Sequence, residues 1–203
     1  MKSTLLLAGL IGITGTAWGQ GTSTVDLRQA SQTQVGPLQS QSLRIGNAQG
    51  SGSARVSVGA ANQVQAGALN KQDMNIGNAS GNGRTNVQVG AATQVQAGAL
   101  NLQGMDIGNA KDNGRTDVKV GAATQVQAGA LNRQQMSIGN ASGGGRTEVR
   151  VGAVTQAQAG AMNNQTTEIG NNSSGGTTRV SVGSVTQAQG GVFGSNNVRI
   201  GNR

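Results

Sequence analysis

Apolar and polar residues alternate along most of this chain with a period of two. Between residues 118 and 140, Val118, Val120 and Ile138 have one parity, and Lys119 and Arg133 have the other. Successive side chains of a β-strand point to opposite faces, so this alternation predicts strands with an inner and a solvent-facing side. The frequent glycines and paired β-branched residues disfavour a helix over the same stretch.

The parity rule assigns each residue of this stretch to one side. The residues that it places inside are Val118, Val120, Ala122, Thr124, Val126, Ala128, Ala130, Asn132, Gln134, Met136, Ile138 and Asn140. The residues that it places in solvent are Lys119, Gln125, Gln127, Arg133, Gln135 and Ser137. We divide the unit into an arm over 115–127, a bend over 128–132, a second arm over 133–140 and a glycine-rich turn over 141–145. Gly121 is the position at which the first arm is expected to break.

The whole pattern repeats at intervals of 31 residues. The triplet Ile-Gly-Asn begins at Ile45 and returns at every 31st residue up to Ile200, without an insertion. A constant interval is typical of stacked repeats, because one extra residue would shift every later position out of register. The sequence therefore predicts an all-β protein, a β-solenoid whose strand-turn-strand rungs stack about 4.8 Å apart in an amyloid-like, cross-β manner. Six 31-residue repeats are expected over residues 25–203, at about 25–55, 56–86, 87–117, 118–148, 149–179 and 180–203.

Stacking would place each residue over its equivalents in the neighbouring rungs, and we call such a set a column. Buried amides in one column can bond to one another, each donating to the next and accepting from the one before. Gln134, for example, would lie between Gln103 and Gln165. The columns of Gln125 and Gln127 recur in every unit and are counted among the ladders, while parity places these two residues in solvent.

The residues expected to form the core ladders are Gln32, Gln63, Gln94, Gln125, Gln156 and Gln187; Gln34, Gln65, Gln96, Gln127, Gln158 and Gln189; Gln72, Gln103, Gln134 and Gln165; Asn70, Asn101, Asn132 and Asn163; Ile45, Ile76, Ile107, Ile138, Ile169 and Ile200; and Asn47, Asn78, Asn109, Asn140, Asn171 and Asn202. The glycines expected at the bend are Gly67, Gly98, Gly129 and Gly160.

Composition excludes several kinds of chemistry. The 203 residues include 35 glycines but no cysteine, histidine or tyrosine. The chain therefore has no histidine or thiol for a zinc site, for nucleophilic catalysis or for acid-base catalysis, and it cannot form disulfides. We expect neither enzymatic activity nor a cofactor. The net charge of +8 comes from only 11% charged residues, without the dense basic runs of nucleic-acid-binding arms, so no specific nucleic-acid partner is expected.

The first nineteen residues have the organisation of a signal peptide. Lys2 supplies a positive start, residues 5–13 are apolar, and Ala17 and Gly19 have the small side chains that signal peptidase accepts. We expect cleavage before Gln20, followed by a short segment over 20–24. Because the apolar stretch is too short to span a bilayer and no longer one follows, the mature chain is expected to be secreted and without a transmembrane segment.

Charged residues are mixed with neutral or opposite charges in most columns, which limits repulsion between rungs. Arg84, Arg115 and Arg146 are different, since they occupy the same position in three consecutive units. They are interpreted either as solvated turn residues that bond to loop carbonyls or as a contact for an anion or a polysaccharide.

The bend carries a family resemblance. The sequence Gln-Ala-Gly-Ala-Leu-Asn at 127–132, with copies at 65–70 and 96–101 and a variant at 158–163, resembles the central motif of the curlin repeat. The run at 128–134 also resembles the repeat of the Pseudomonas Fap fibre subunits. The resemblance implies a bacterial functional amyloid of the Gram-negative type, exported through an outer-membrane pore and polymerised, with a nucleator subunit, into cell-surface fibres for biofilm and adhesion. The present unit is longer than the curlin unit, and Ile138 stands where the curlin motif has its closing glutamine.

The two ends of the repeat region differ. The first unit is irregular at Arg28, Pro37 and Gln39, and a proline withholds an N–H, so this unit is a candidate cap. The last unit keeps strand-like sequence to its end, which is expected of a subunit that polymerises head to tail. A fibre subunit is thus the favoured function. The alternative is a monomeric exported solenoid that binds a surface such as glycan or ice through Thr93, Thr124, Thr155 and Thr186, which parity places inside.

Overall fold

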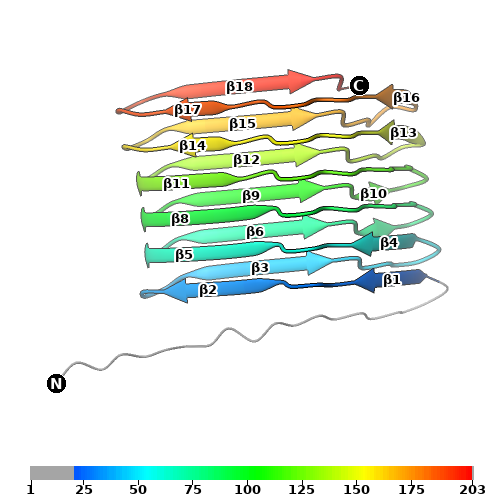
Figure 1. Cartoon of the computed structure of the whole chain (residues 1–203), viewed down its shortest axis with the longest axis horizontal. Helices are drawn as coiled ribbons and strands as arrows, with labels where there is room; N and C mark the ends of the chain where they lie inside the picture. Colours follow the sequence, from blue (N-terminus) through cyan, green and yellow to red (C-terminus); the bar gives the residue numbers. More distant parts are fainter. Residues whose placement is uncertain (1–20, 203) are drawn as a thin grey trace.

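A computed structural model describes residues 21–202, which form stacked parallel β-strands (Figure 1). One six-stranded sheet contains β2 (Ser31–Val35), β5 (Asn62–Ala68), β8 (Thr93–Ala99), β11 (Gln125–Ala130), β14 (Gln156–Gln158) and β17 (Gln187–Gln189). A second contains β3 (Ser40–Ile45), β6 (Lys71–Ile76), β9 (Leu102–Ile107), β12 (Arg133–Ile138), β15 (Asn164–Ile169) and β18 (Ser195–Ile200). Short pairs along the third side are β1 (Thr22–Asp26) with β4 (Ser53–Ser57), β7 (Ala79–Ser80) with β10 (Ala110–Lys111), and β13 (Gly145–Glu148) with β16 (Gly176–Arg179).

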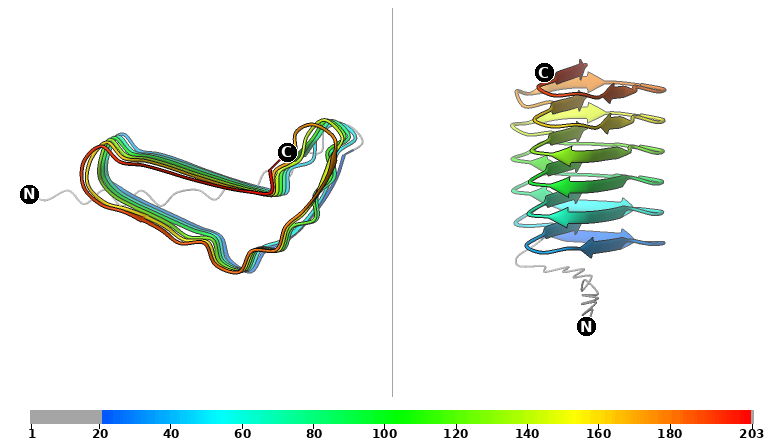
Figure 2. Two further views of the ribbon diagram at one scale, coloured as in Figure 1. Left: turned by 90° about the horizontal axis from the view of Figure 1, so that it is seen from above. Right: turned by 90° about the vertical axis from the view of Figure 1, so that its left-hand side faces the viewer.

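Strand pairing follows the 31-residue interval. Met136 of β12 pairs with Met105 of β9 on one side and with Thr167 of β15 on the other. Seen along the axis, successive rungs superpose in one closed outline (Figure 2). The predicted all-β solenoid of about six stacked rungs is therefore confirmed. Residues 22–24 already belong to β1, ahead of the expected boundary at residue 25, while the predicted signal peptide at 1–19 lies outside the described residues.

The dry core is a narrow seam of β-branched and methionine side chains. Met136 and Ile138 are fully buried and belong to one cluster with Val118 and Val149. Gly139 follows Ile138 with φ +63°, and a Cβ at this position would come within 2.7 Å of the Val118 side chain. The glycine of each Ile-Gly-Asn triplet thus leaves the space that the valines of the neighbouring arm fill.

The parity rule fails in the middle of the rung. Gln125 and Gln127 are buried, at 0% and 1% exposed, whereas Val126 is 38% exposed. Gly121 and Ala122 have φ of +66° and +69°, so two consecutive residues leave the extended conformation. This break shifts the alternation by one residue between Val120 and the next strand. The prediction that Gln125 and Gln127 face solvent is therefore wrong, as is the inner placement of Thr124, Val126 and Ala128.

The bend between the two large sheets requires glycine at one position and has a bulky side chain at another. Gly129 has φ +107°, and a Cβ there would lie 1.8 Å from the carbonyl oxygen of Gly160. Two residues later, Leu131 has φ +57° and is about half exposed. The exposed apolar column that contains Leu131 is made up of Leu38, Leu69, Leu100, Leu131, Met162 and Phe193.

Pro37 does not remove a hydrogen-bond donor from the outer edge of the first rung. In a regular rung, the equivalent N–H, that of Ala130, donates to the carbonyl of Gly160 in the following rung. The N–H that Pro37 lacks would therefore point toward the second rung and not toward the free edge. The Gly67 carbonyl keeps one of its two usual donors, because Gln39 Nε2 donates to it at 2.7 Å as Asn132 Nδ2 does to Gly160 in a regular rung. The expectation that this proline caps the stack is wrong, since the edge facing away from the second rung keeps its polar groups.

Replacing Gly129 by alanine should destabilise the fold by at least about 3 kcal/mol, because the added Cβ would overlap the Gly160 carbonyl in a backbone conformation that disfavours side chains. The matched control is Gly104→Ala, since a Cβ on Gly104 would meet nothing within 4 Å. Chemical unfolding followed by circular dichroism measures both variants. Equal stability of the two would contradict the tight stacking at the bend.

Candidate functional site

The first amide ladder runs through the second sheet. Gln134 Nε2 donates to Gln165 Oε1 at 2.7 Å, and Gln134 Oε1 accepts from Gln103 Nε2 at 2.8 Å. The same Nε2 donates to the carbonyl of Val126 across the core at 3.1 Å. Gln72 continues the ladder by donating to Gln103. Because both hydrogens and the oxygen of a buried amide are bonded, glutamine is accommodated in a core that would otherwise exclude it.

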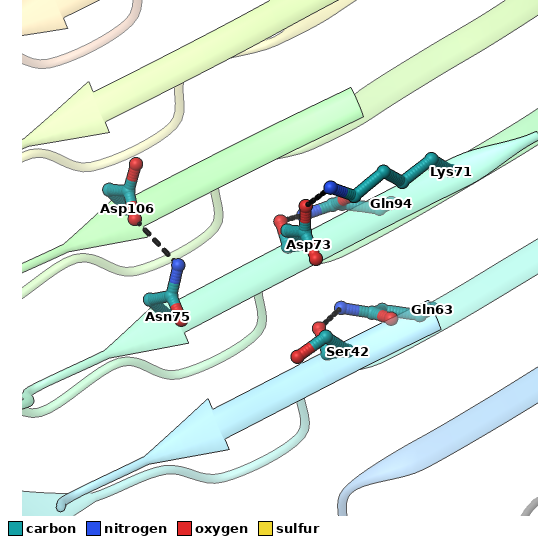
Figure 3. A network of polar contacts seen from close by, with 7 residues as sticks. All are labelled: Ser42, Gln63, Lys71, Asp73, Asn75, Gln94 and Asp106. Carbon is teal, nitrogen blue, oxygen red and sulfur yellow. Dashed lines mark hydrogen bonds and ion pairs between the residues drawn. The ribbon is translucent and has the colours of Figure 1, made fainter. Parts of the chain in front are cut away.

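The other two glutamine columns behave differently from each other. Gln96 donates to Gln127 at 3.2 Å and Gln127 to Gln158 at 3.4 Å, so this column is also a ladder, though a longer-bonded one. Gln125 instead donates across the core to the carbonyl of Gly104, at 2.9 Å, in the preceding rung. Gln94 does the same to the Asp73 carbonyl (Figure 3). The Gln125 column therefore ties the two sheets together and does not bond along the stack, so the expectation that this column forms a ladder is wrong.

Asparagine at the bend explains the spacing of the repeated motif. Asn132 Nδ2 donates to the carbonyl of Ala128, four residues earlier, and to the carbonyl of Gly160 in the next rung, at 3.0 and 3.1 Å. The N–H of Asn132 donates to Asn101 Oδ1 at 3.0 Å. The Asn132 side chain thus closes the turn within its rung and bonds to the following rung, while its backbone N–H bonds to the preceding one.

The Ile-Gly-Asn column forms a partly buried ladder. The backbone N–H of Asn109 donates to Asn140 Oδ1 at 2.8 Å, and Asn140 Nδ2 donates to Asn171 Oδ1 at 3.3 Å. The isoleucine two residues before each asparagine lies in the core; Ile107 and Ile138 are fully buried. The four ladder-forming columns and the cross-core column are brought together in every regular rung.

Charged groups lie outside the core, and several are paired. Lys71 Nζ lies 3.3 Å from Asp73, and Glu148 lies 3.2 Å from Arg150 and 3.4 Å from Arg179. Asp106 is more enclosed and accepts a hydrogen bond from Asn75 Nδ2 at 2.9 Å (Figure 3). Burial raises the pKa of Asp106 above its ordinary value of 3.8; the Asn75 hydrogen bond lowers this pKa and the nearby Asp73 raises it.

Arg84, Arg115 and Arg146 are exposed and stack at the start of the third side of the rung. They line a shallow groove of about 320 Å³ together with Thr85 and Asn86.

The threonine column of the alternative surface-binding function also lies outside the core. Thr124, directly before β11, is on the outer side of the first six-stranded sheet. The three outward columns of the sheet are uncharged: Ser31, Asn62, Thr93, Thr124, Thr155 and Thr186; Thr33, Val64, Val95, Val126, Ala157 and Ala188; and Val35, Ala66, Ala97, Ala128, Ala159 and Gly190.

Comparisons with known proteins give no match, whether to a family model, to a curated protein or to a solved structure. The resemblance to curlin repeats thus rests on the sequence motif. Among residues 21–202 there is no group of three or more acidic, histidine or cysteine side chains that could hold a metal ion. The same residues include no helix that is long and apolar enough to cross a membrane.

Truncating Gln134 to alanine should cost about 1–3 kcal/mol, because Gln165 Oε1 and the Val126 carbonyl lose their donor inside the core. Gln135→Ala is the control, since the side chain of Gln135 is exposed on the other face of the same strand. Denaturant titration compares the two variants with the parent chain. A Gln134 variant as stable as the control would contradict the contribution of the ladder.

Asp106→Asn should stabilise the fold at neutral pH. Because the folded-state pKa of Asp106 is raised, folding favours its protonated form, and this stability is present below 3.8 and lost as the pH rises through the folded-state value. Asparagine removes the cost of ionisation and keeps an oxygen for Asn75. Thermal unfolding at neutral pH and at about pH 3 should show a gain that shrinks on acidification. Asp112→Asn, on the exposed turn, removes the same charge; an equal gain in that variant would contradict the effect of burial.

Proposed function

We propose that this protein is the structural subunit of an extracellular amyloid-like fibre, which grows when copies add rung upon rung. The observation that carries the proposal is the state of the two ends. Within the described residues, β17 and β18 pair on one side only, as do β2 and β3 at the opposite end of the stack. An unpaired strand edge is a template for another chain, and parallel stacking of one end on the other gives a head-to-tail polymer.

The edge of β18 has its hydrogen-bonding groups directed outward. In β15, the N–H of Asn164 donates to the Gly194 carbonyl, and the N–H of Gly170, just after this strand, donates to the Ile200 carbonyl, so both point toward the last rung. Alternate residues of a parallel strand share this direction, and the register relates Thr166 to Asn197. The N–H and carbonyl of Asn197 therefore point away from the stack, where a strand of a second copy would bond.

Two glutamine columns of the first rung match those of the last. Gln187 donates to the Thr166 carbonyl at 3.3 Å. One rung further, Gln32 of a second copy would take the place of Gln187, and Asn197 takes the place of Thr166. The same stacking would place Gln34 of the second copy next to Gln189, as Gln127 lies next to Gln158. The bonds of these two glutamine columns would thus continue between chains.

One column opposes this stacking. Arg199 in the last rung and Arg44 in the first belong to the same column, so head-to-tail contact places two like charges about 4.8 Å apart. Both side chains are exposed to water, where like charges at this separation repel by only about 1 kcal/mol, and this repulsion is small beside a full set of strand hydrogen bonds.

The proposed cell-surface location and partners rest on sequence features alone. The signal-like start and the curlin-like motif favour export from a bacterium of the Gram-negative type, through an outer-membrane pore and with a nucleator subunit. The fibre would support biofilm and surface adhesion, with a polysaccharide or a host surface as its contact. Its role would be structural and not enzymatic.

A second candidate function is supported by the outer face of the first sheet. This face is regular and uncharged, and its threonine column lies outside the core. Such a regular face could lie against a glycan or an ice surface in a monomeric solenoid. A chain that stays monomeric while retaining its β-structure would favour this function over the fibre.

Asn197→Pro should slow fibre elongation at least several-fold while leaving the folded chain intact. Proline removes an outward N–H that makes no bond within the described chain, and edge strands tolerate such a substitution. Asn197→Ala, which keeps the N–H, is the control. Seeded growth is followed by light scattering and electron microscopy, with circular dichroism as the check on folding. Equal growth of both variants would contradict addition at the β18 edge, and a parent chain without filaments would overturn the fibre proposal.

A further inference from the structure

We propose that Arg84, Arg115 and Arg146 bind the carboxylates of an extended acidic polysaccharide. The three residues are joined by parallel bridges between successive rungs, so their Cα atoms lie in a line parallel to the axis of the stack. The spacing of this line is the distance between strands, about 4.8 Å. All three side chains are exposed, which leaves their guanidinium groups available to a ligand.

This arginine ladder has no ionic partner within the described chain. Lys71 has Asp73 as its partner, and Glu148 is shared between Arg150 and Arg179, whereas none of the three ladder arginines forms an ion pair among residues 21–202. Three like charges in consecutive rungs repel one another. A bound row of anions would relieve this repulsion, with one negative charge for each rung.

The surrounding surface favours an anion. The three outward columns of this side include seven basic residues and three acidic ones: Arg55, Arg84, Arg115, Lys119, Arg146, Arg150 and Arg179 against Asp26, Asp117 and Glu148. The groove along the ladder is lined by Ser53 and Asn86, which can hydrogen-bond to sugar hydroxyls. Asp117 and Glu148 line the same groove, and their negative charges would keep a bound carboxylate on the arginine side.

The geometry of the ladder favours a polysaccharide over a nucleic acid. An extended polyuronate has one carboxylate for each sugar, at axial intervals similar to the rung spacing. Successive carboxylates are turned about the chain axis, and the long arginine side chains can follow them, each guanidinium binding a carboxylate through two parallel hydrogen bonds. The phosphates of duplex DNA wind around a wide cylinder and soon leave a straight row of arginines. Single strands are bound through stacked aromatic side chains, and the aromatic residue of the described chain, Phe193, lies at the bend between β17 and β18.

The test uses the purified full chain immobilised on a sensor, with oligogalacturonates of one to six units as probes. Affinity should rise with each unit up to three and then change little, because three rungs contribute arginine. The triple variant Arg84→Gln, Arg115→Gln, Arg146→Gln should lose about tenfold or more in affinity for the trimer, which corresponds to about 1.4 kcal/mol. Replacement of the same three residues by lysine should keep only part of the parent chain's affinity, since an ammonium group cannot form the two parallel hydrogen bonds of a guanidinium.

The control variant carries Arg28→Gln, Arg44→Gln and Arg133→Gln, which remove the same charge from exposed positions outside the ladder. An equal loss of affinity in this variant would reduce the interaction to general attraction and overturn the proposal. Absence of binding by the parent chain would also overturn it. A third contrary result would be that duplex DNA binds more tightly than the hexamer and that the arginine-to-glutamine variant loses this DNA binding. Binding to an immobilised chain does not require assembly, so the result is separate from that of the fibre experiment.

Discussion

The structure depends on one constraint, which is that every residue of a regular rung lies over an equivalent residue of the next. This constraint makes buried amides stable here, because Gln134 finds in Gln103 and Gln165 the donor and acceptor that it requires. It also explains why the interval never changes from 31 residues, since an insertion would separate each amide from its partner. A core without tyrosine and cysteine can be stable on this basis, with hydrogen bonds replacing much of the usual apolar bulk.

The same constraint acts on the backbone of the bend. Gly129 approaches the Gly160 carbonyl so closely that a side chain has no space, and Asn132 bonds both within its rung and to the next. Since the turn is shaped by contacts between rungs, a single repeat would lack the partners that hold it. A ladder of this kind has no internal reason to end, which connects the stability of the fold with its proposed capacity to grow.

Much of this fold could be predicted from the sequence because it depends on distances along the chain. The interval between Ile-Gly-Asn triplets determines the stacking register, and the recurrence of Gln134 and Asn132 at that interval is enough to indicate amide ladders. Which side chains of β11 and its equivalents face the core could not be predicted in this way. Counting parity assumes an unbroken strand, whereas Gly121 and Ala122 both adopt positive φ, and an alanine gives no sequence signal of that conformation.

Two other errors have a similar origin. The effect of Pro37 depends on the direction of one N–H, which is determined by the register between rungs and not by the local sequence. The glutamine columns look alike in sequence, yet Gln125 bonds across the core and Gln127 bonds along it, because they occupy different positions relative to the facing strand. Motif spacing thus identifies which residues are stacked, while the direction of each hydrogen bond has to be seen in three dimensions.

X-ray fibre diffraction of the chain from Gln20 to Arg203, after quiescent incubation at neutral pH, tests the central claim most directly. The account predicts filaments with a meridional reflection at about 4.7–4.8 Å, from strands that continue in register across the junction between copies, and an equatorial one near 10 Å. A chain that keeps its β-structure but stays monomeric at high concentration would contradict the account.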